Sequence, residues 1–299
     1  MTDVADVSGA ADTADSAGAV DRDGLDERES AEATLAALVD VVDDLASRRP
    51  VASRIVAMTA DSSVGSPELA GVLASDVALT ARVTRLANSV FYGLSGRVRT
   101  LPFAVTVVGF AAVRAMAATA AAGADTEGVL PEDTWVRSEA VAVACGELAP
   151  VFGIPAPEVF CLGLLAGLGQ AVLAHHDPTG YRAILDDDDV RRGGRQALLA
   201  AERTAFGVCH TEVSAAALSA WHFPDELAEA LHLVDAPGGT TAWSRCLGTA
   251  LEAVERAASP QAPPRDPWLL SSGRVAEDRL RALASRLQVT APREEPGET

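Results

Sequence analysis

The sequence contains no lysine, so arginine supplies all 24 of its basic residues. Acidic residues outnumber them at 42, which gives a formal net charge of −18 at pH 7. Such a chain is repelled by phosphate-rich surfaces, so its composition argues against non-specific binding to DNA or to anionic membranes. We expect neither a membrane nor DNA among its general partners.

Three further features are missing. The four cysteines form no Cys-x-x-Cys pair, so we expect buried, reduced thiols at Cys145, Cys161, Cys209 and Cys246. Residues 1–30 have neither the basic start nor the apolar core of a signal peptide. No uninterrupted apolar run approaches the roughly 20 residues that a membrane span needs. Together these absences predict a cytoplasmic bacterial protein.

Aromatic residues are also scarce, at 4% of the chain against 48% for all hydrophobic residues. Alanine therefore makes up much of the apolar content. Stretches rich in alanine and poor in β-branched residues favour close-packed helices over sheets. We find no convincing strand, and the sequence predicts an all-α fold.

The helical part is expected to span residues 31–258 as one domain in two helical subdomains. Residues 31–122 form a first lobe of short helices, and a polar break follows at residues 123–128. Residues 123–258 form a second lobe, in which a nearly uninterrupted apolar helix from Ala156 to Ala174 is expected to be central.

The two ends differ from this domain. Residues 1–30 consist largely of Asp, Ala, Ser, Gly and Thr, with almost nothing to bury, so we expect a disordered acidic tail. Residues 259–289 combine a proline-rich linker with an amphipathic docking helix. Residues 290–299 are a polar tail.

The most informative stretch covers residues 73–94. A helix is predicted from Asp76, whose carboxylate can cap free N–H groups. Apolar residues then follow at spacings of four, three and four, which places them on one helical face: Leu79, Val83, Leu86 and Val90. Asn88 and Ser89 end this pattern, and Phe91-Tyr92-Gly93 predicts a compact aromatic turn.

This run, with the Leu-Pro-Phe-Ala-Val that follows and then Gly109, resembles the HDOD domain family. HDOD domains are non-catalytic relatives of the HD and HD-GYP metal phosphohydrolases. Later matches are the Glu202…Phe206-Gly207…His210 run and a Trp-x-x-Pro turn. The resemblance implies an HD-like bundle with structural roles for Asp76, Asn88, Ser89, Tyr92, Gly93, Gly109, Glu202, Gly207, Trp221 and Pro224.

The resemblance also implies where metal ligands would lie. The catalytic relatives carry a His-Asp pair in a Leu-Leu-His-Asp-Ile-Gly helix, and here Ala166 and Gly167 stand at those positions. Arg137 stands near an earlier ligand, and a guanidinium cannot bind a cation. Only His210 and His232 persist. We therefore expect vestigial positions, with no metal, no cofactor and no enzymatic activity; the alternative is a metal-dependent phosphodiesterase or phosphohydrolase with a displaced site.

Two acidic or histidine-containing runs could suggest other metal sites. His175-His176-Asp177 spells a His-Asp pair, but neighbouring helical residues point about 100° apart, so we interpret it as a polar helix end. The run Asp186–Asp189 is followed by Arg191, Arg192 and Arg195, which predicts a solvated loop whose charges compensate one another.

One charge asymmetry suggests a binding surface. Residues 77–124 contain no acidic residue but five arginines: Arg82, Arg85, Arg97, Arg99 and Arg114. One interpretation is an ordinary solvated face. The other is a surface for an acidic partner segment or a nucleotide, because arginine pairs bidentately with carboxylate and phosphate. The acidic N-terminal tail could occupy that surface in cis, and DNA binding through these arginines is a third, weaker option.

The resemblance implies a regulatory module that acts through protein contacts in two-component or cyclic-dinucleotide signalling. The sequence names neither the partner, the ligand, the input signal nor the oligomeric state.

Overall fold

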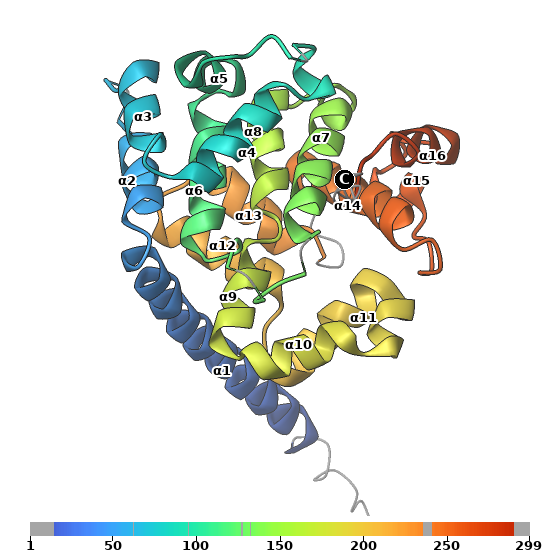
Figure 1. Ribbon diagram of the computed structural model, residues 1–299. Coiled ribbons are helices and arrows are strands. Elements are labelled where there is room, and N and C mark those ends of the chain that lie inside the picture. The colour runs from blue at the N-terminus through green and yellow to red at the C-terminus, as the bar shows by residue number, and fades with distance from the viewer. Residues whose placement is uncertain are drawn as a thin grey trace, which may run out of the picture.

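The computed structural model describes residues 15–289 apart from residues 62, 95, 127, 132 and 236–240, and it describes side chains from residue 29 onward. Within these residues every regular element is a helix (Figure 1), and there is no strand. The expected all-α fold is confirmed.

Seven elements lie in the part of the N-terminal half that the structure describes. They are α1 (Asp15–Ser47), α2 (Pro50–Met58), α3 (Ser66–Leu73), α4 (Val77–Ala87), the short 3-10 helix η1 (Val90–Tyr92), α5 (Leu101–Val108) and α6 (Phe110–Ala121). The first helix begins well before Ala31, so residues 15–30 are helical rather than disordered; residues 1–14 lie outside the described part. Leu38 and Val42 pack the C-terminal part of α1 into the core.

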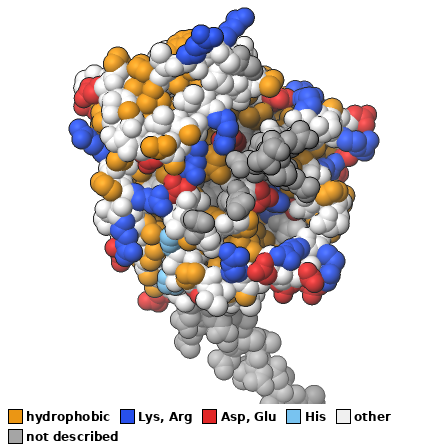
Figure 2. All heavy atoms as spheres, in the orientation of Figure 1, with side chains coloured by type: hydrophobic (Ala, Val, Ile, Leu, Met, Phe, Trp, Pro, Cys, Tyr) orange, Lys and Arg blue, Asp and Glu red, His pale blue; other side chains and the backbone are white. Residues whose placement is uncertain are grey.

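The described residues of the C-terminal half form ten helices. They are α7 (Thr134–Phe152), α8 (Ala156–Leu165), α9 (Leu168–His176), α10 (Pro178–Asp186), α11 (Asp188–Phe206), α12 (His210–Ala220), α13 (Asp225–Leu233), α14 (Ala242–Ala258), α15 (Pro267–Leu270) and α16 (Glu277–Ala284). The single helix expected from Ala156 to Ala174 is broken at Ala166 and Gly167 into α8 and α9. Side chains of both charge signs intermingle over α10 and α11 (Figure 2).

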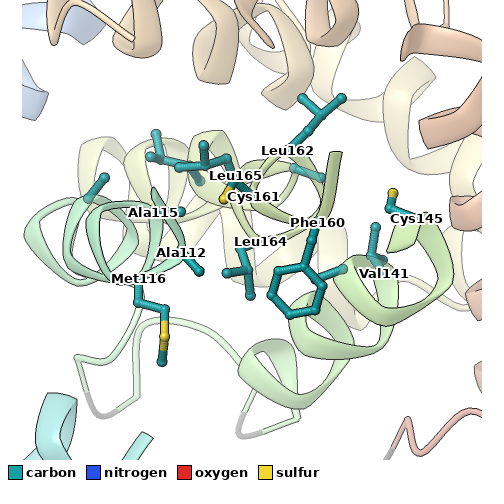
Figure 3. Close-up of a cluster of buried hydrophobic side chains, with 14 of the residues drawn as sticks. Ala112, Ala115, Met116, Val141, Cys145, Phe160, Cys161, Leu162, Leu164 and Leu165 are labelled. Carbon is teal, nitrogen blue, oxygen red and sulfur yellow. The ribbon is translucent and has the colours of Figure 1, made fainter. Parts of the chain in front are cut away.

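Helix α8 lies at the centre of the fold, between α6 and α7 (Figure 3). A Cβ on Gly163 would lie 2.5 Å from the Cα of Ala142, so the backbones of α7 and α8 approach as closely as the glycine spacing predicts. Phe160 of α8 stacks on Phe91, with ring centroids 4.8 Å apart. Buried side chains from Leu38 to Val289 form one cluster, so the two expected lobes share a continuous core.

The stretch Ala156–His176, which covers α8 and α9, is apolar and long enough to cross a membrane by length and composition. However, 72% of its most apolar window is buried by the rest of the protein. Its apolar side chains therefore build the core.

The motif around α4 has the structure that its sequence predicts. Asp76 caps α4 and accepts a hydrogen bond from the backbone N–H of Leu79 at 2.9 Å. The side-chain amide of Asn88 bonds both the N–H and the carbonyl of Val98, at 3.1 and 3.0 Å, and so holds the loop that follows. Gly93 has a left-handed backbone, which ends the aromatic turn.

The other motif positions differ in their contacts. Gly109 joins α5 to α6 at a φ of 86°, and Gly207 ends α11 at a φ of 74°. The Tyr92 hydroxyl points to the carbonyl of Val108 at 3.5 Å, whereas the buried Ser89 hydroxyl has no partner among the described residues. Pro224 precedes α13, and Trp221, at the end of α12, is only partly buried.

Candidate functional site

A cavity of about 470 Å³ lies where α7, the α8–α9 turn, α11, α12 and α14 meet. Four of the five positions that the resemblance marks as vestigial metal positions line it: Arg137, Ala166, Gly167 and His210. The fifth, His232, does not; it is exposed in the last turn of α13. The fold therefore brings together the positions expected on α7, α8 and α12, but not the one on α13.

His210 is placed by close packing between α9 and the start of α12. A Cβ on Gly169 would overlap the carbonyl oxygen of His210 and lie 2.8 Å from its carbonyl carbon. The backbone N–H of Gly169 donates to the Ser214 hydroxyl at 2.8 Å. This contact holds the first turn of α12, and thus the imidazole, against the cavity wall.

A fully buried carboxylate holds the imidazole from behind. Glu202 accepts hydrogen bonds from the backbone N–H of His210 at 2.9 Å and from its Nδ1 at 2.7 Å. It also accepts from the buried Tyr181 hydroxyl at 2.7 Å. Since Nδ1 carries its proton toward Glu202, Nε2 presents its lone pair on the opposite side.

That lone pair faces a guanidinium. Nη1 of Arg195 lies 3.3 Å from Nε2 of His210. The same guanidinium bonds both oxygens of Asp235, Nε to Oδ1 at 3.0 Å and Nη2 to Oδ2 at 2.6 Å. The expectation that Arg195 belongs to a solvated loop is wrong. Helix α11 is interrupted at Gly194, whose φ of 63° turns the chain so that Arg195 enters the fold.

The network continues to the C-terminal segment. Nε of Arg265 lies 3.0 Å from a carboxylate oxygen of the buried Glu252, and its Nη1 lies 3.9 Å from Asp235. Glu252 also pairs with Arg256 at 2.8 Å, and Arg256 pairs with Glu277 of α16 at 2.6 Å. Ion pairs thus connect the wall of the cavity to the segment that was expected to be a linker and docking helix.

The electrostatics of the network favour its ionised form. Burial by itself would raise the pKa of Glu202, but the His210 ring and backbone N–H and the Tyr181 hydroxyl outweigh it and lower that pKa. Burial would likewise raise the pKa of Asp235, but the Arg195 guanidinium outweighs it and lowers that pKa. Glu255, which lines the cavity, is the exception, since burial raises its pKa.

These residues do not fit a metal ion. Both ring nitrogens of His210 are engaged, while the side chains at Ala166 and Gly167 offer no lone pair. Among the residues that the structure describes, no group of three or more His, Cys, Asp or Glu side chains is arranged to hold a metal. A hydrolytic metal site needs several such ligands and an open position for water.

The five arginines between residues 77 and 124 make different contacts. Arg82 pairs with Asp125 at 3.1 Å and stacks on the Trp135 ring at 4.3 Å. Arg85 pairs with Glu139 at 2.7 Å.

Arg114 donates to the carbonyl of Trp221 at 2.9 Å and lies over the Phe223 ring at 4.1 Å. Arg97 and Arg99 are exposed and form no ion pair with any described residue. Of the five arginines, only Arg97 and Arg99 are thus both exposed and without an ion-pair partner among the described residues.

Of the two other runs, the histidine run ends a helix as expected, whereas the aspartate run ends α10 and begins α11 instead of forming a loop. His175 and His176 form the last turn of α9, and Nε2 of His175 lies 3.2 Å from the carbonyl oxygen of Gly123. Arg191 and Arg192 pair on the surface with Asp186 and Asp189, at 2.6 and 2.5 Å.

The family model of the HDOD domain matches residues 45–237. No curated protein matches the chain.

Three solved structures share the fold. One is a protein from Shewanella amazonensis SB2B, provisionally described as a phosphohydrolase, with a TM-score of 0.60 and 24% identity over 84% of this chain and 93% of that one. Another is an HDOD domain protein of unknown function from Geobacter sulfurreducens, with a TM-score of 0.54 and 20% identity over 84% of this chain and 98% of that one. The third is from Marinobacter aquaeolei VT8, provisionally described as a signal transduction protein, with a TM-score of 0.59 and 23% identity over 80% of this chain.

The chain spans only 55% of the Marinobacter protein. At these identities the likeness concerns the fold, whereas the family match covers most of the chain, including α2 to α13. The chain belongs to the HDOD domain family.

Proposed function

We propose that this protein is a non-catalytic HDOD module of bacterial cytoplasmic signalling, which acts by binding a partner rather than by hydrolysing phosphate esters. One observation carries the proposal. Ala166, Gly167 and Arg137, at positions where the resemblance implies metal ligands in the catalytic relatives, line the cavity, and His210 beside them is held between a carboxylate and a guanidinium. The description of the Marinobacter relative as a signal transduction protein is consistent with this role.

We propose the connection between α4 and α5 as the binding surface. It carries the exposed Arg97 and Arg99 and the apolar Val90, which is 90% exposed, and Phe103 in the first turn of α5 is 45% exposed. Basic side chains project from the edge of the molecule where this connection lies (Figures 1 and 2). An acidic protein segment with apolar anchors fits this chemistry, and a nucleotide phosphate is the alternative ligand for the two arginines.

Reversing these charges tests the surface. We expect the double variant Arg97→Glu, Arg99→Glu to bind its partner at least about tenfold more weakly at low salt, because two favourable charge contacts become repulsive. The measurement is affinity capture from the native host followed by titration of the captured protein. Arg192→Glu, another exposed arginine, serves as the matched control.

Equal affinity of the double variant and the wild type would exclude this surface. Hydrolysis of a phosphodiester that disappears in His210→Ala would instead support the alternative, a phosphodiesterase or phosphohydrolase with a displaced site.

A further inference from the structure

We propose that the guanidinium of Arg195 is the resident cation of this site and stands in place of the metal ion that an HD-like fold would hold. The Asp235 carboxylate and the lone pair of the His210 imidazole both face one point in the interior. The group at that point is a side chain of the protein, the Arg195 guanidinium. This inference rests on the interior of the fold and not on partner binding, so failure of the capture experiment leaves it standing.

The first line of support is the orientation of the imidazole. In metalloproteins, a carboxylate typically binds one ring nitrogen of a histidine while the other nitrogen faces the metal. Glu202 binds Nδ1 of His210 here, and Nε2 faces Nη1 of Arg195 at 3.3 Å. The carboxylate and imidazole are thus arranged as for a cation, and the cation is a guanidinium.

The second line is the carboxylate on the other side. Asp235 binds Arg195 through both oxygens, and the two side chains are only 18% and 11% exposed. The charges of Glu202 and Glu255 also act on the guanidinium. One imidazole and one carboxylate thus contact the Arg195 guanidinium directly, and the charges of two further carboxylates favour its cationic form.

The backbone enforces this placement. Gly194 has a φ of 63°, which side chains other than glycine rarely adopt, and a Cβ there would lie 2.6 Å from a carboxylate oxygen of Glu255. Arg191 and Arg192 precede this turn and pair on the surface, whereas the side chain of Arg195 follows it and is only 11% exposed. The turn at Gly194 thus directs Arg195 inward, whereas Arg191 and Arg192 stay on the surface.

A cation of this kind has different properties from a metal. It is covalently attached, so it neither dissociates nor exchanges. It has donors only and no open coordination position, so it cannot bind and activate water. We therefore infer a permanently closed electrostatic centre that holds α11, α12 and the Asp235 segment together.

Removal and chemical replacement of the guanidinium test the proposal. Arg195→Ala is expected to lower Tm by about 10 °C, because it leaves buried carboxylates without their counter-ion. Arg192→Ala, an exposed arginine on the same helix, should change Tm by about 2 °C at most. Guanidinium ion at about 20 mM should raise the Tm of Arg195→Ala, since it can bind in the vacated space, and should not raise that of the wild type.

The double variant Arg195→Ala, Asp235→Asn removes the main counter-charge and should lose the response to guanidinium. If Arg195→Ala does not fold, Arg195→Lys is compared with Arg195→Gln, and the lysine variant should be the more stable. An Arg195→Ala protein as stable as Arg192→Ala would overturn the proposal. The proposal would also be overturned if guanidinium raised the Tm of Arg195→Ala no more than that of the double variant. A third contrary result is an Arg195→Gln protein at least as stable as Arg195→Lys.

Discussion

Replacing Glu202 with alanine is expected to lower the free energy of unfolding by about 3–5 kcal/mol, the range for breaking a buried ionic network. Glu202 has no exposed surface and accepts hydrogen bonds from the Tyr181 hydroxyl and from the ring and backbone of His210. Its removal leaves these donors buried without an acceptor, and it removes one of the charges that stabilise Arg195. Urea unfolding at neutral pH measures the loss.

Glu147 provides the control for this prediction. It pairs with Arg286 at 2.6 Å, but the two side chains are 41% and 58% exposed, so Glu147→Ala should cost less than about 1 kcal/mol. A Glu202→Ala protein no less stable than Glu147→Ala would show that the buried network does not stabilise the fold.

The same carboxylate predicts a dependence on pH. The pKa of Glu202 is lower in the folded protein than its ordinary value of 4.5, so in acid the unfolded chain binds the proton more readily. The stabilisation is fully present above pH 4.5 and is lost as the pH falls through the lowered pKa. The difference in stability between wild type and Glu202→Gln should therefore shrink over that acidic range.

Gly169→Ala is expected to destabilise the protein by about 3 kcal/mol or more, at the upper end of the range for overpacking a core. The added methyl group would overlap the carbonyl oxygen of His210 and lie 2.9 Å from the backbone nitrogen of Ser214. These are backbone atoms, so no side chain can rotate to relieve the overlap, and α9 would have to move away from α12. A fall in Tm of at least about 6 °C is expected in a thermal melt.

Gly71→Ala is the matched control, since Gly71 is exposed in α3 and a Cβ there would meet no atom within 4 Å. Alanine is the better helix former, so this variant should be as stable as the wild type or up to about 1 kcal/mol more stable. Unchanged melting of Gly169→Ala would mean that the contact between α9 and α12 is looser than described.

The fold and part of the site could be predicted because their signals are local. The spacing of apolar residues in α4 and the capping position of Asp76 depend on neighbours within one or two turns. The resemblance around Ala166 and Gly167 likewise rests on one short stretch, and it implies that these residues replace the His-Asp pair of the catalytic relatives. The close approach at Gly163 and Gly169 follows from the same stretch.

The rest depends on partners that are distant in sequence. Arg195 and Asp235 are 40 residues apart, and Arg82 and Asp125 are 43 residues apart. Gly193-Gly194 indicates that a helix is interrupted, but not which of the following side chains turns inward. For the same reason, sequence alone overestimated the number of free arginines between residues 77 and 124.

Isothermal titration of the purified protein with Mn²⁺ and Zn²⁺, repeated on His210→Ala, tests the central claim most directly. The account predicts that the wild type and His210→Ala give the same titration curve, because the His210 ring already binds Glu202 and Arg195. One equivalent of metal bound by the wild type and lost in His210→Ala would contradict it.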